Sequence, residues 1–233
     1  MKKFPNITRR DFMMTAGGTI VSIGLPGVFY KFTDDENNAI AAELRPDGRP
    51  RIPPGQHAVK ALQAMGGFKS DASASDWSLK INGEVKNPLT LKLPDLMKLK
   101  QVKQICDVHC VTGWTLLDSR WDGIPLKVIM ELVEVKDNAG FVIFEAPGGY
   151  SSSIPICEAN KDNVMLAHGL YDEKLPSAHG APLRALVPDR YFYKSVKWLQ
   201  RINFTIKDEP GYYESNGYSN SADPWKEQRF DDD

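Results

Sequence analysis

Hydrophobic and polar positions along the 233-residue chain predict many short strands, separated by glycine and proline turns, and few helices. Apolar and polar residues alternate from Trp77 to Ile81, and the β-branched run 102–110 alternates in a similar way, so we expect a strand in each. Further strands are expected at residues 141–144, 164–167, 185–187 and at the end of 196–206. The pattern therefore predicts a mixed α+β domain dominated by β structure.

Helices and turns are fewer and more local. Apolar residues at i, i+3, i+4 and i+7 predict an amphipathic helix over 125–133, and a proline begins a shorter helix over 94–97. Asn82-Gly83 is typical of a type I′ hairpin turn, and Trp121-Asp122-Gly123 is interpreted as a second turn. After residue 210 the chain is irregular but rich in aromatic residues, so we expect it to pack across the domain.

The start of the chain resembles an export signal rather than part of a fold. Arg9 and Arg10 precede residues 12–30, a 19-residue run that carries no charge and includes four glycines and a proline. Paired arginines before such a run are typical of the twin-arginine pathway, which carries folded and often cofactor-loaded proteins. Ala39-Ile40-Ala41 fits a small-residue cleavage pattern, but the uncharged run is also long enough to tether the chain to a membrane. We expect residues 1–41 to be a signal or an anchor, and the protein to be periplasmic or otherwise extracytoplasmic.

The rest of the chain divides into an arm and one domain. Residues 42–76 are predicted to be an extended arm, because the prolines between 45 and 55 prevent regular ladders. Residues 77–233 then form a single domain, and the chain is long enough to bury a substantial core. With 29 Lys and Arg against 30 Asp and Glu, the chain lacks the basic footprint of a nucleic-acid-binding protein, so no nucleic-acid partner is expected.

The three cysteines are Cys106, Cys110 and Cys157. On a strand, Cys106 and Cys110 lie about 13 Å apart, whereas the Cα atoms of a disulfide lie within about 7 Å. Cys157 could pair with either of them, or all three could be free. Cys110 ends the predicted strand beside a glycine turn, where a thiolate could be a soft metal ligand, a nucleophile or half of a disulfide. The lone His109 and His168 are interpreted as structural.

A second cluster of candidate residues lies between positions 179 and 198. Gly180 permits close backbone approach, and Pro182 fixes the entry into the next strand. The cluster supplies donors suited to an anionic phosphate, namely Arg184, Lys194, Ser195 and Lys197. A solvated basic strand edge is the alternative interpretation.

Six motifs, in this order, resemble the core of the sulfite oxidase family of molybdenum oxidoreductases. They are His109-Cys110-Val111-Thr112-Gly113-Trp114, Trp121-Asp122-Gly123-Ile124-Pro125-Leu126, Gly149-Tyr150-Ser151-Ser152-Ser153-Ile154-Pro155, His179-Gly180-Ala181-Pro182-Leu183-Arg184, Tyr193-Lys194-Ser195-Val196-Lys197-Trp198-Leu199 and Asp223-Pro224-Trp225. The resemblance runs from about Trp77 to Phe230. It is nearest to a short bacterial branch similar to periplasmic methionine sulfoxide reductase catalytic subunits.

The resemblance implies a fold of the molybdopterin-binding type and a molybdenum ion held by a pyranopterin (molybdopterin). Cys110 matches the cysteine that ligates the metal at the catalytic centre. The other matched positions bind the cofactor, His179 and Arg184 through the pterin and Ser195, Val196 and Lys197 through the phosphate. His179 departs from relatives that often carry asparagine there.

The substrate side departs further from the family pattern. The sulfite oxidases proper carry an arginine-containing run after the cysteine, where this chain has none, and Arg120 or Arg190 could substitute for it. Trp114 and Tyr150 are candidate pocket walls, and an apolar wall suits a thioether or a sulfoxide better than sulfite.

The sequence therefore predicts an exported molybdenum oxidoreductase that transfers an oxygen atom to or from a small, sulfur-containing substrate. Larger relatives carry a haem domain, so the electron partner is expected to be a separate protein, a cytochrome or a membrane quinone-linked protein. A membrane tether through residues 12–30 is a further expectation. Two alternatives stay open: a metal-free, β-rich binding protein and a thiol-based redox protein that uses Cys110.

Overall fold

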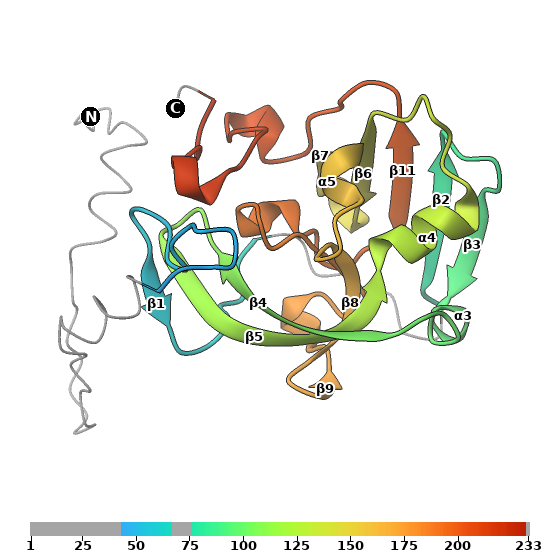
Figure 1. Ribbon diagram of the computed structural model, residues 1–233. Helices are drawn as coiled ribbons and strands as arrows, with labels where there is room; N and C mark the ends of the chain where they lie inside the picture. Colours follow the sequence, from blue (N-terminus) through green and yellow to red (C-terminus); the bar gives the residue numbers. More distant parts are fainter. Residues whose placement is uncertain (1–42, 67–75, 232–233) are drawn as a thin grey trace, which may run out of the picture. The chain divides into compact units, whose positions relative to one another are not determined.

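A computed structural model describes residues 43–66 and 76–231, which form two mixed β-sheets with short helices between them (Figure 1). The first sheet contains β1 (His57–Val59), β4 (Val102–His109), β5 (Trp114–Pro125), β8 (Met165–Leu170), β9 (Glu173–Lys174) and β10 (Arg184–Leu186). The second has the order β3 (Leu89–Lys92), β2 (Ser78–Gly83), β11 (Arg201–Thr205), β6 (Phe141–Glu145) and β7 (Ser151–Pro155). Most pairs are antiparallel, but β1–β5 and β2–β11 are parallel. The predicted fold class is confirmed.

Three α-helices connect the strands in the described part of the chain: α3 (Leu93–Leu96), α4 (Leu126–Val133) and α5 (Ile156–Ala159). The predicted helices at 94–97 and 125–133 correspond to α3 and α4. Single 3-10 turns occupy Pro147–Gly149, Ser177–His179, Phe192–Lys194, Glu214–Asn216 and Pro224–Lys226. Within the residues described, no helix is long and apolar enough to cross a membrane. The predicted signal or anchor lies outside the described residues.

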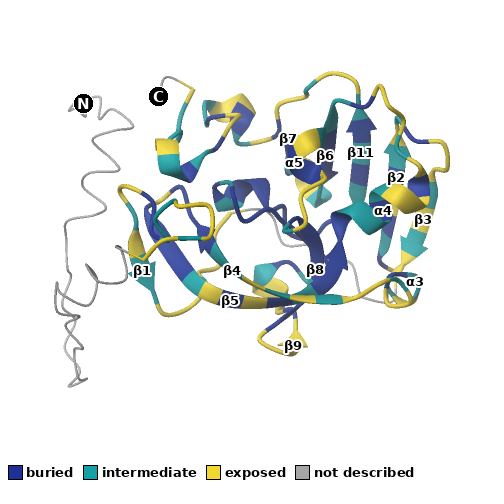
Figure 2. Cartoon of the chain, viewed as in Figure 1, coloured by how far each residue is buried: buried dark blue, intermediate teal, exposed yellow. Residues whose placement is uncertain are grey.

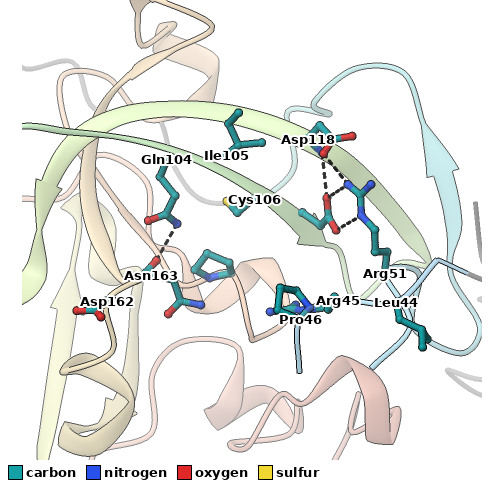
Figure 3. A pocket seen from close by; sticks show the side chains of 12 residues that line it. Leu44, Arg45, Pro46, Arg51, Gln104, Ile105, Cys106, Asp118, Asp162 and Asn163 are labelled. Carbon is teal, nitrogen blue, oxygen red and sulfur yellow. Dashed lines mark hydrogen bonds and ion pairs between the residues drawn. The ribbon is translucent and has the colours of Figure 1, made fainter. Parts of the chain in front are cut away.

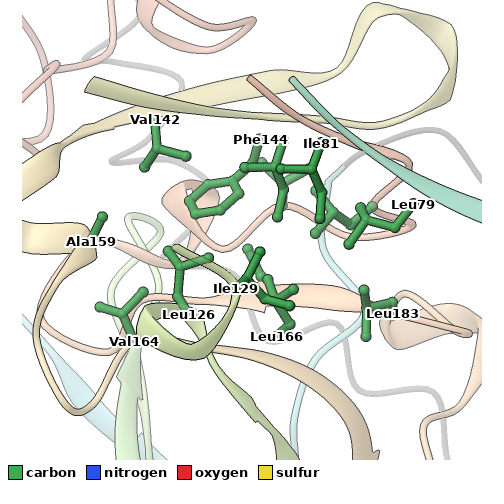
Figure 4. Packing of buried hydrophobic residues seen from close by; sticks show 14 of the residues in the cluster. Leu79, Ile81, Leu126, Ile129, Val142, Phe144, Ala159, Val164, Leu166 and Leu183 are labelled. Carbon is green, nitrogen blue, oxygen red and sulfur yellow. The ribbon is translucent and has the colours of Figure 1, made fainter. Parts of the chain in front are cut away.

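The main hydrophobic core lies where α4 packs between the sheets (Figure 4). Leu126, Ile129 and Val133 form the buried stripe of α4, as the helical spacing predicts. Around them are residues of the second sheet, such as Phe144, and of the first sheet, such as Leu166. Burying a leucine or isoleucine side chain contributes about 1.5–3 kcal/mol, so this cluster fixes the two sheets against each other.

A separate hydrophobic cluster supports the first sheet near Cys110. It contains Val108, Trp114, Leu116 and Trp121 of β4 and β5, all almost fully buried. In Figure 2 the end of β5 near β1 is buried, whereas β9 is exposed. The cysteine is therefore presented from a rigid part of the sheet.

Both predicted turns are wrong because strands distant in the sequence pair there. Asn82 and Gly83 lie within β2 and pair with Asn203 and Phe204 of β11, so the connection from β2 to β3 comes later in the chain. A Cβ atom on Gly83 would lie 2.0 Å from the Phe204 carbonyl oxygen, so the glycine serves close strand approach.

The segment from Trp121 to Gly123 lies within β5, a central strand with β4 on one side and β8 on the other. The register shifts between Asp122 and Gly123, and a Cβ atom on Gly123 would lie 2.1 Å from the Leu166 carbonyl oxygen. This glycine therefore marks a bulge in a central strand, which local sequence does not distinguish from a turn.

The two ends of the described chain also join the fold. The predicted arm contributes a ladder of its own, because β1 pairs with residues Trp114 to Leu116 of β5. The segment after residue 210 packs across the domain as predicted, since the Trp225 indole donates to the carbonyl of Pro50 over 2.8 Å. Both segments thereby approach the turn that follows β4.

Candidate cofactor-binding site

Five of the six predicted site residues border one cavity of about 170 Å³: Cys110, His179, Arg184, Ser195 and Lys197. They come from the turn after β4, from the approach to β10 and from the segment before β11. Long-range strand pairing thus brings together positions as far apart as 110 and 197. Val196 does not border the cavity, because its side chain lies in the main core.

Cys110 occupies the first position of a tight turn between β4 and β5. Its N–H donates to the Trp114 carbonyl over 2.8 Å, and its carbonyl accepts from the Gly113 N–H over 3.0 Å. Gly113 has φ of 103°, a conformation that favours glycine. Only 6% of Cys110 is exposed, and the Thr112 hydroxyl donates to its sulfur over 3.1 Å.

Burial raises the pKa of the Cys110 thiol, and the hydrogen bond from Thr112 offsets this only in part. A neutral buried thiol is a poor nucleophile, because the thiolate is the reactive form. A bound cation such as a metal ion would stabilise the thiolate at this position. The environment of Cys110 therefore suits a metal ligand better than a free redox thiol.

Arg184 is the most deeply buried cation bordering the cavity. Its guanidinium donates to three backbone carbonyls, including those of His179 over 3.0 Å and Ser195 over 2.7 Å. The guanidinium carbon lies 4.2 Å from the ring centre of Phe192. Burial lowers the pKa of Arg184 to about 9, and no carboxylate pairs with it in the described structure. A buried cation surrounded by carbonyls and by the rings of Phe192 and Trp121 is prepared for an anionic ligand.

Lys197 adds to the same positive surface, and His179 adds an imidazole that can form hydrogen bonds. The Lys197 ammonium donates to the Ala178 carbonyl over 3.2 Å, and burial together with Arg184 lowers its pKa to about 8. Burial, followed by Arg184 and Lys197, also lowers the pKa of His179. None of the described residues that border the cavity is acidic, so no negative side chain among them would repel an anion that enters it.

Gly180 allows these cationic segments to come together, as the sequence predicts. Its φ is 109°, and a Cβ atom placed there would lie 2.9 Å from the Cβ atom of Lys197. The Trp198 N–H donates to the Gly180 carbonyl over 3.2 Å across the same contact. Any side chain at position 180 would push the segment that carries Lys197 away from the cavity.

The segment from 194 to 196 divides its side chains between the cavity and the interior. Ser195 borders the cavity, and its hydroxyl accepts from the Val187 N–H over 2.9 Å at the end of β10. Lys194 points away, so its predicted role as a phosphate donor is wrong. Its ammonium lies 2.5 Å from a carboxylate oxygen of Glu214 and 2.9 Å from the Ser153 carbonyl.

The candidate substrate residues are placed differently from one another. Tyr150 borders the cavity and donates to the Tyr193 carbonyl over 3.1 Å, whereas Trp114 lies in the hydrophobic cluster and does not border it. Arg120 pairs with Asp172, and Arg190 pairs with Glu158 and Asp223. Neither arginine borders the cavity, so neither replaces the guanidinium of the sulfite oxidases proper.

Several cavity residues are not among the candidate site residues predicted from the sequence. They are Gln63, Met65 and Gly66 of the arm, Thr112 beside the cysteine, and the aromatic residues Phe192, Tyr193, Tyr213 and Tyr218. Thr112 and Tyr193 lie within two of the six motifs, and the Thr112 hydroxyl lies two residues along the chain from the thiol. The aromatic cluster could have been suspected from the tyrosine-rich end of the chain.

All three cysteines are free. Cys106 lies at a second hollow of about 440 Å³ (Figure 3), which does not border Cys110. Ion pairs cross this hollow, including Arg51 to Asp107 over 2.7 Å. Burial raises the pKa of Cys106 to about 12, which disfavours its reactive thiolate form.

His109 and His168 have the environments expected of structural histidines. The ring of His109 is fully buried, lies 2.9 Å from the Thr115 hydroxyl and packs edge-on against Trp225. His168 lies 2.8 Å from the side-chain oxygen of Gln101.

Comparisons with known proteins all point to one family. The sequence profile of the oxidoreductase molybdopterin binding domain matches residues 66–213. An uncharacterized oxidoreductase of Bacillus subtilis, YuiH, is 36% identical over 182 residues, which cover 77% of this chain and 92% of that protein. The protein-methionine-sulfoxide reductase catalytic subunit MsrP of Ralstonia nicotianae is 35% identical over 150 residues, which cover 58% of this chain and 45% of MsrP.

Among solved structures, the sulfane dehydrogenase SoxCD of Paracoccus pantotrophus matches with a TM-score of 0.55 and 25% identity. The match covers 60% of this chain and 40% of that one. The fold and the cavity thus define a molybdopterin-binding oxidoreductase of the sulfite oxidase type. The chain belongs to the oxidoreductase molybdopterin-binding family, as the six motifs predicted.

Proposed function

We propose that this protein is an exported molybdenum–pyranopterin enzyme that transfers an oxygen atom to or from a small, sulfur-containing substrate. One observation carries the proposal: a buried cysteine borders a cavity together with Arg184 and Lys197, and no acidic residue borders it among those described. The sulfur is the donor that a molybdenum ion would need from the protein. The cations match the phosphate of the pterin.

Each residue has a task that the geometry supports. Cys110 would ligate the metal, and Arg184 and His179 would bind the pterin. Lys197 and Ser195 would hold the phosphate, with Val196 contributing through its backbone. When bound, the molybdenum–pyranopterin supplies the two-electron redox chemistry that oxygen-atom transfer needs.

The walls of the cavity favour an uncharged sulfur substrate. Aromatic side chains form much of the wall, among them Tyr150 and Tyr213, and among the described residues that border it the only guanidinium is that of Arg184, which the proposal assigns to the pterin. Such walls suit a thioether or a sulfoxide. The name of the MsrP relative, a protein-methionine-sulfoxide reductase, points to the same class of substrate.

Export and electron supply complete the proposal. The paired Arg9 and Arg10 and the uncharged run 12–30 favour export in folded form by the twin-arginine pathway, with cleavage near Ala41 or a retained tether. A separate electron-transfer protein, a cytochrome or a membrane quinone-linked protein, would exchange electrons with the enzyme.

Metal analysis of the purified full-length protein, followed by a reduced-dye assay against sulfoxides and other S- and N-oxides, tests the function. We expect about one molybdenum per chain in the wild type and in Cys157→Ser, whose cysteine is exposed. We expect turnover to be lost in Cys110→Ser with the fold retained. An active Cys110→Ser variant would contradict the ligand assignment. A folded, metal-free wild type would favour the binding protein or, if Cys110 were readily labelled, the thiol-based redox protein.

A further inference from the structure

Residues outside the matched family domain hold the turn that carries Cys110. The side-chain amide of Gln56 donates to the Cys110 carbonyl over 3.1 Å, and the guanidinium of Arg229 donates to the Val111 carbonyl. Both donors lie beyond residues 66–213, one on each side. We propose that Gln56 and Arg229 are positioning residues that fix the direction in which Cys110 presents its sulfur.

Three carbonyls of the turn are each held from outside. In addition to those of Cys110 and Val111, the Gly113 carbonyl accepts from the backbone N–H of His57 over 2.9 Å. The Cys110 carbonyl, held by Gln56, belongs to the peptide plane that follows Cys110, and the Cys110 N–H, which donates to the Trp114 carbonyl, belongs to the plane that precedes it. These two planes fix the Cα–Cβ bond of Cys110. The bonds to the Val111 and Gly113 carbonyls hold the rest of the turn in place.

The two donors are themselves held in place. The side-chain oxygen of Gln56 accepts from the Thr115 hydroxyl over 3.5 Å, and this hydroxyl lies 2.9 Å from Nδ1 of the His109 ring. The Arg229 guanidinium also donates to the Gly55 carbonyl over 3.3 Å, which ties the arm and the C-terminal segment to one turn. Because each donor has a second partner, its side chain is held in the orientation that makes the hydrogen bond to the turn.

The inference rests on the proposed function for its consequence at the metal, but not for its structural content. A ligand whose direction is fixed keeps the geometry of the metal constant, and supporting hydrogen bonds commonly change metal affinity by about 10–100-fold. A loose turn would leave the cavity intact while it changed the position of the sulfur. The two effects can be measured separately.

The first test is amide hydrogen exchange over residues 110–114 in the full-length protein as purified. Gln56→Leu removes the donor, and Gln56→Glu keeps the shape but places an acceptor against the Cys110 carbonyl. We expect exchange to rise about tenfold in both, as for the loss of one net hydrogen bond. Arg229→Met should act in the same direction. Unchanged exchange in Gln56→Glu would overturn the proposal.

Gln104→Leu is the matched control. It removes a similar hydrogen bond, from a glutamine amide to the Asn163 carbonyl over 2.9 Å, at the other end of β4. If Gln56→Leu only lowered the overall stability, Gln104→Leu would show the same faster exchange. If Gln56 holds the turn, exchange over residues 110–114 rises in Gln56→Leu and not in Gln104→Leu. Equal exchange over 110–114 in Gln104→Leu and Gln56→Leu would assign Gln56 a general structural role and refute the inference.

The second test examines the metal. We expect Gln56→Glu to retain molybdenum about 10–100-fold less well during dialysis, and to change the electron paramagnetic resonance spectrum of its molybdenum(V) state. A wild-type spectrum in this variant would refute the role at the metal. A wild type without molybdenum would instead refute the proposed function, while the exchange results would still decide whether Gln56 and Arg229 position the turn.

Discussion

The buried ion pair between Lys194 and Glu214 gives the sharpest test of the fold around the cavity. Both side chains are 1% exposed, and the ammonium nitrogen lies 2.5 Å from a carboxylate oxygen. Lys194 also donates to the Ser153 carbonyl and to the side chain of Asn220, and Ser152 donates to Glu214. The pair joins the segment that carries the cavity residues to the C-terminal segment.

Lys194→Met should destabilise the protein strongly, because it leaves the Glu214 carboxylate buried without its cation. Breaking a buried pair from one side costs about 3–5 kcal/mol, a large fraction of the 5–15 kcal/mol typical of a domain. For a domain of this size each kcal/mol lowers Tm by about 2–4 °C, so we expect a fall of roughly 6–20 °C. One oxygen of Glu214 is already buried without a hydrogen bond, so the interior offers little further compensation.

The double variant Lys194→Met with Glu214→Leu separates a lost pair from a disturbed core. Replacing both charges by apolar groups removes the uncompensated carboxylate, so the double variant should recover at least about 2 kcal/mol relative to Lys194→Met. Urea unfolding of the wild type, both single variants and the double variant measures the coupling. The reasoning is refuted if the costs of the two single variants simply add, or if Lys194→Met costs less than about 1 kcal/mol.

Three further predictions concern the surroundings of the site. Gly180→Ala should lower the free energy of unfolding by about 1–3 kcal/mol and reduce the molybdenum content. The reason is that φ of 109° is strained for alanine and that its Cβ atom would contact the segment carrying Lys197. A Tm equal to that of the wild type would contradict this prediction. Asp189→Asn should lower the free energy of unfolding at pH 7. Burial opposes ionisation of Asp189, but its amide and guanidinium partners favour the carboxylate and lower its pKa in the folded state. The stability that the carboxylate contributes is therefore present above about pH 4 and is lost as the pH falls through the folded-state pKa. Urea midpoints that differ equally at pH 3 and pH 7 would contradict the assignment. Maleimide at pH 8 should label the exposed Cys157 first, with Cys106 reacting only on unfolding, as peptide mass spectrometry can show.

Local sequence chemistry predicted much of the fold correctly. The spacing of apolar residues located α4, and alternation located β2 and β4, because these patterns report which face of an element is buried. The same reasoning failed at Gly83 and Gly123, where the glycine serves contact between neighbouring strands rather than a turn. A glycine shows that a side chain would not fit, but it does not show what lies opposite.

The sequence by itself determined the family and the residues available for chemistry, since Cys110 and the motifs around His179 and Lys197 are read from residue type and order. Only the tertiary structure decided how they are used. It directs Lys197 to the cavity and Lys194 to Glu214, and it brings Gln56 and Arg229 to the turn of the cysteine. The physical reason is that charge and hydrogen-bonding capacity belong to a residue, whereas its partner is fixed by strand pairing across long stretches of the chain.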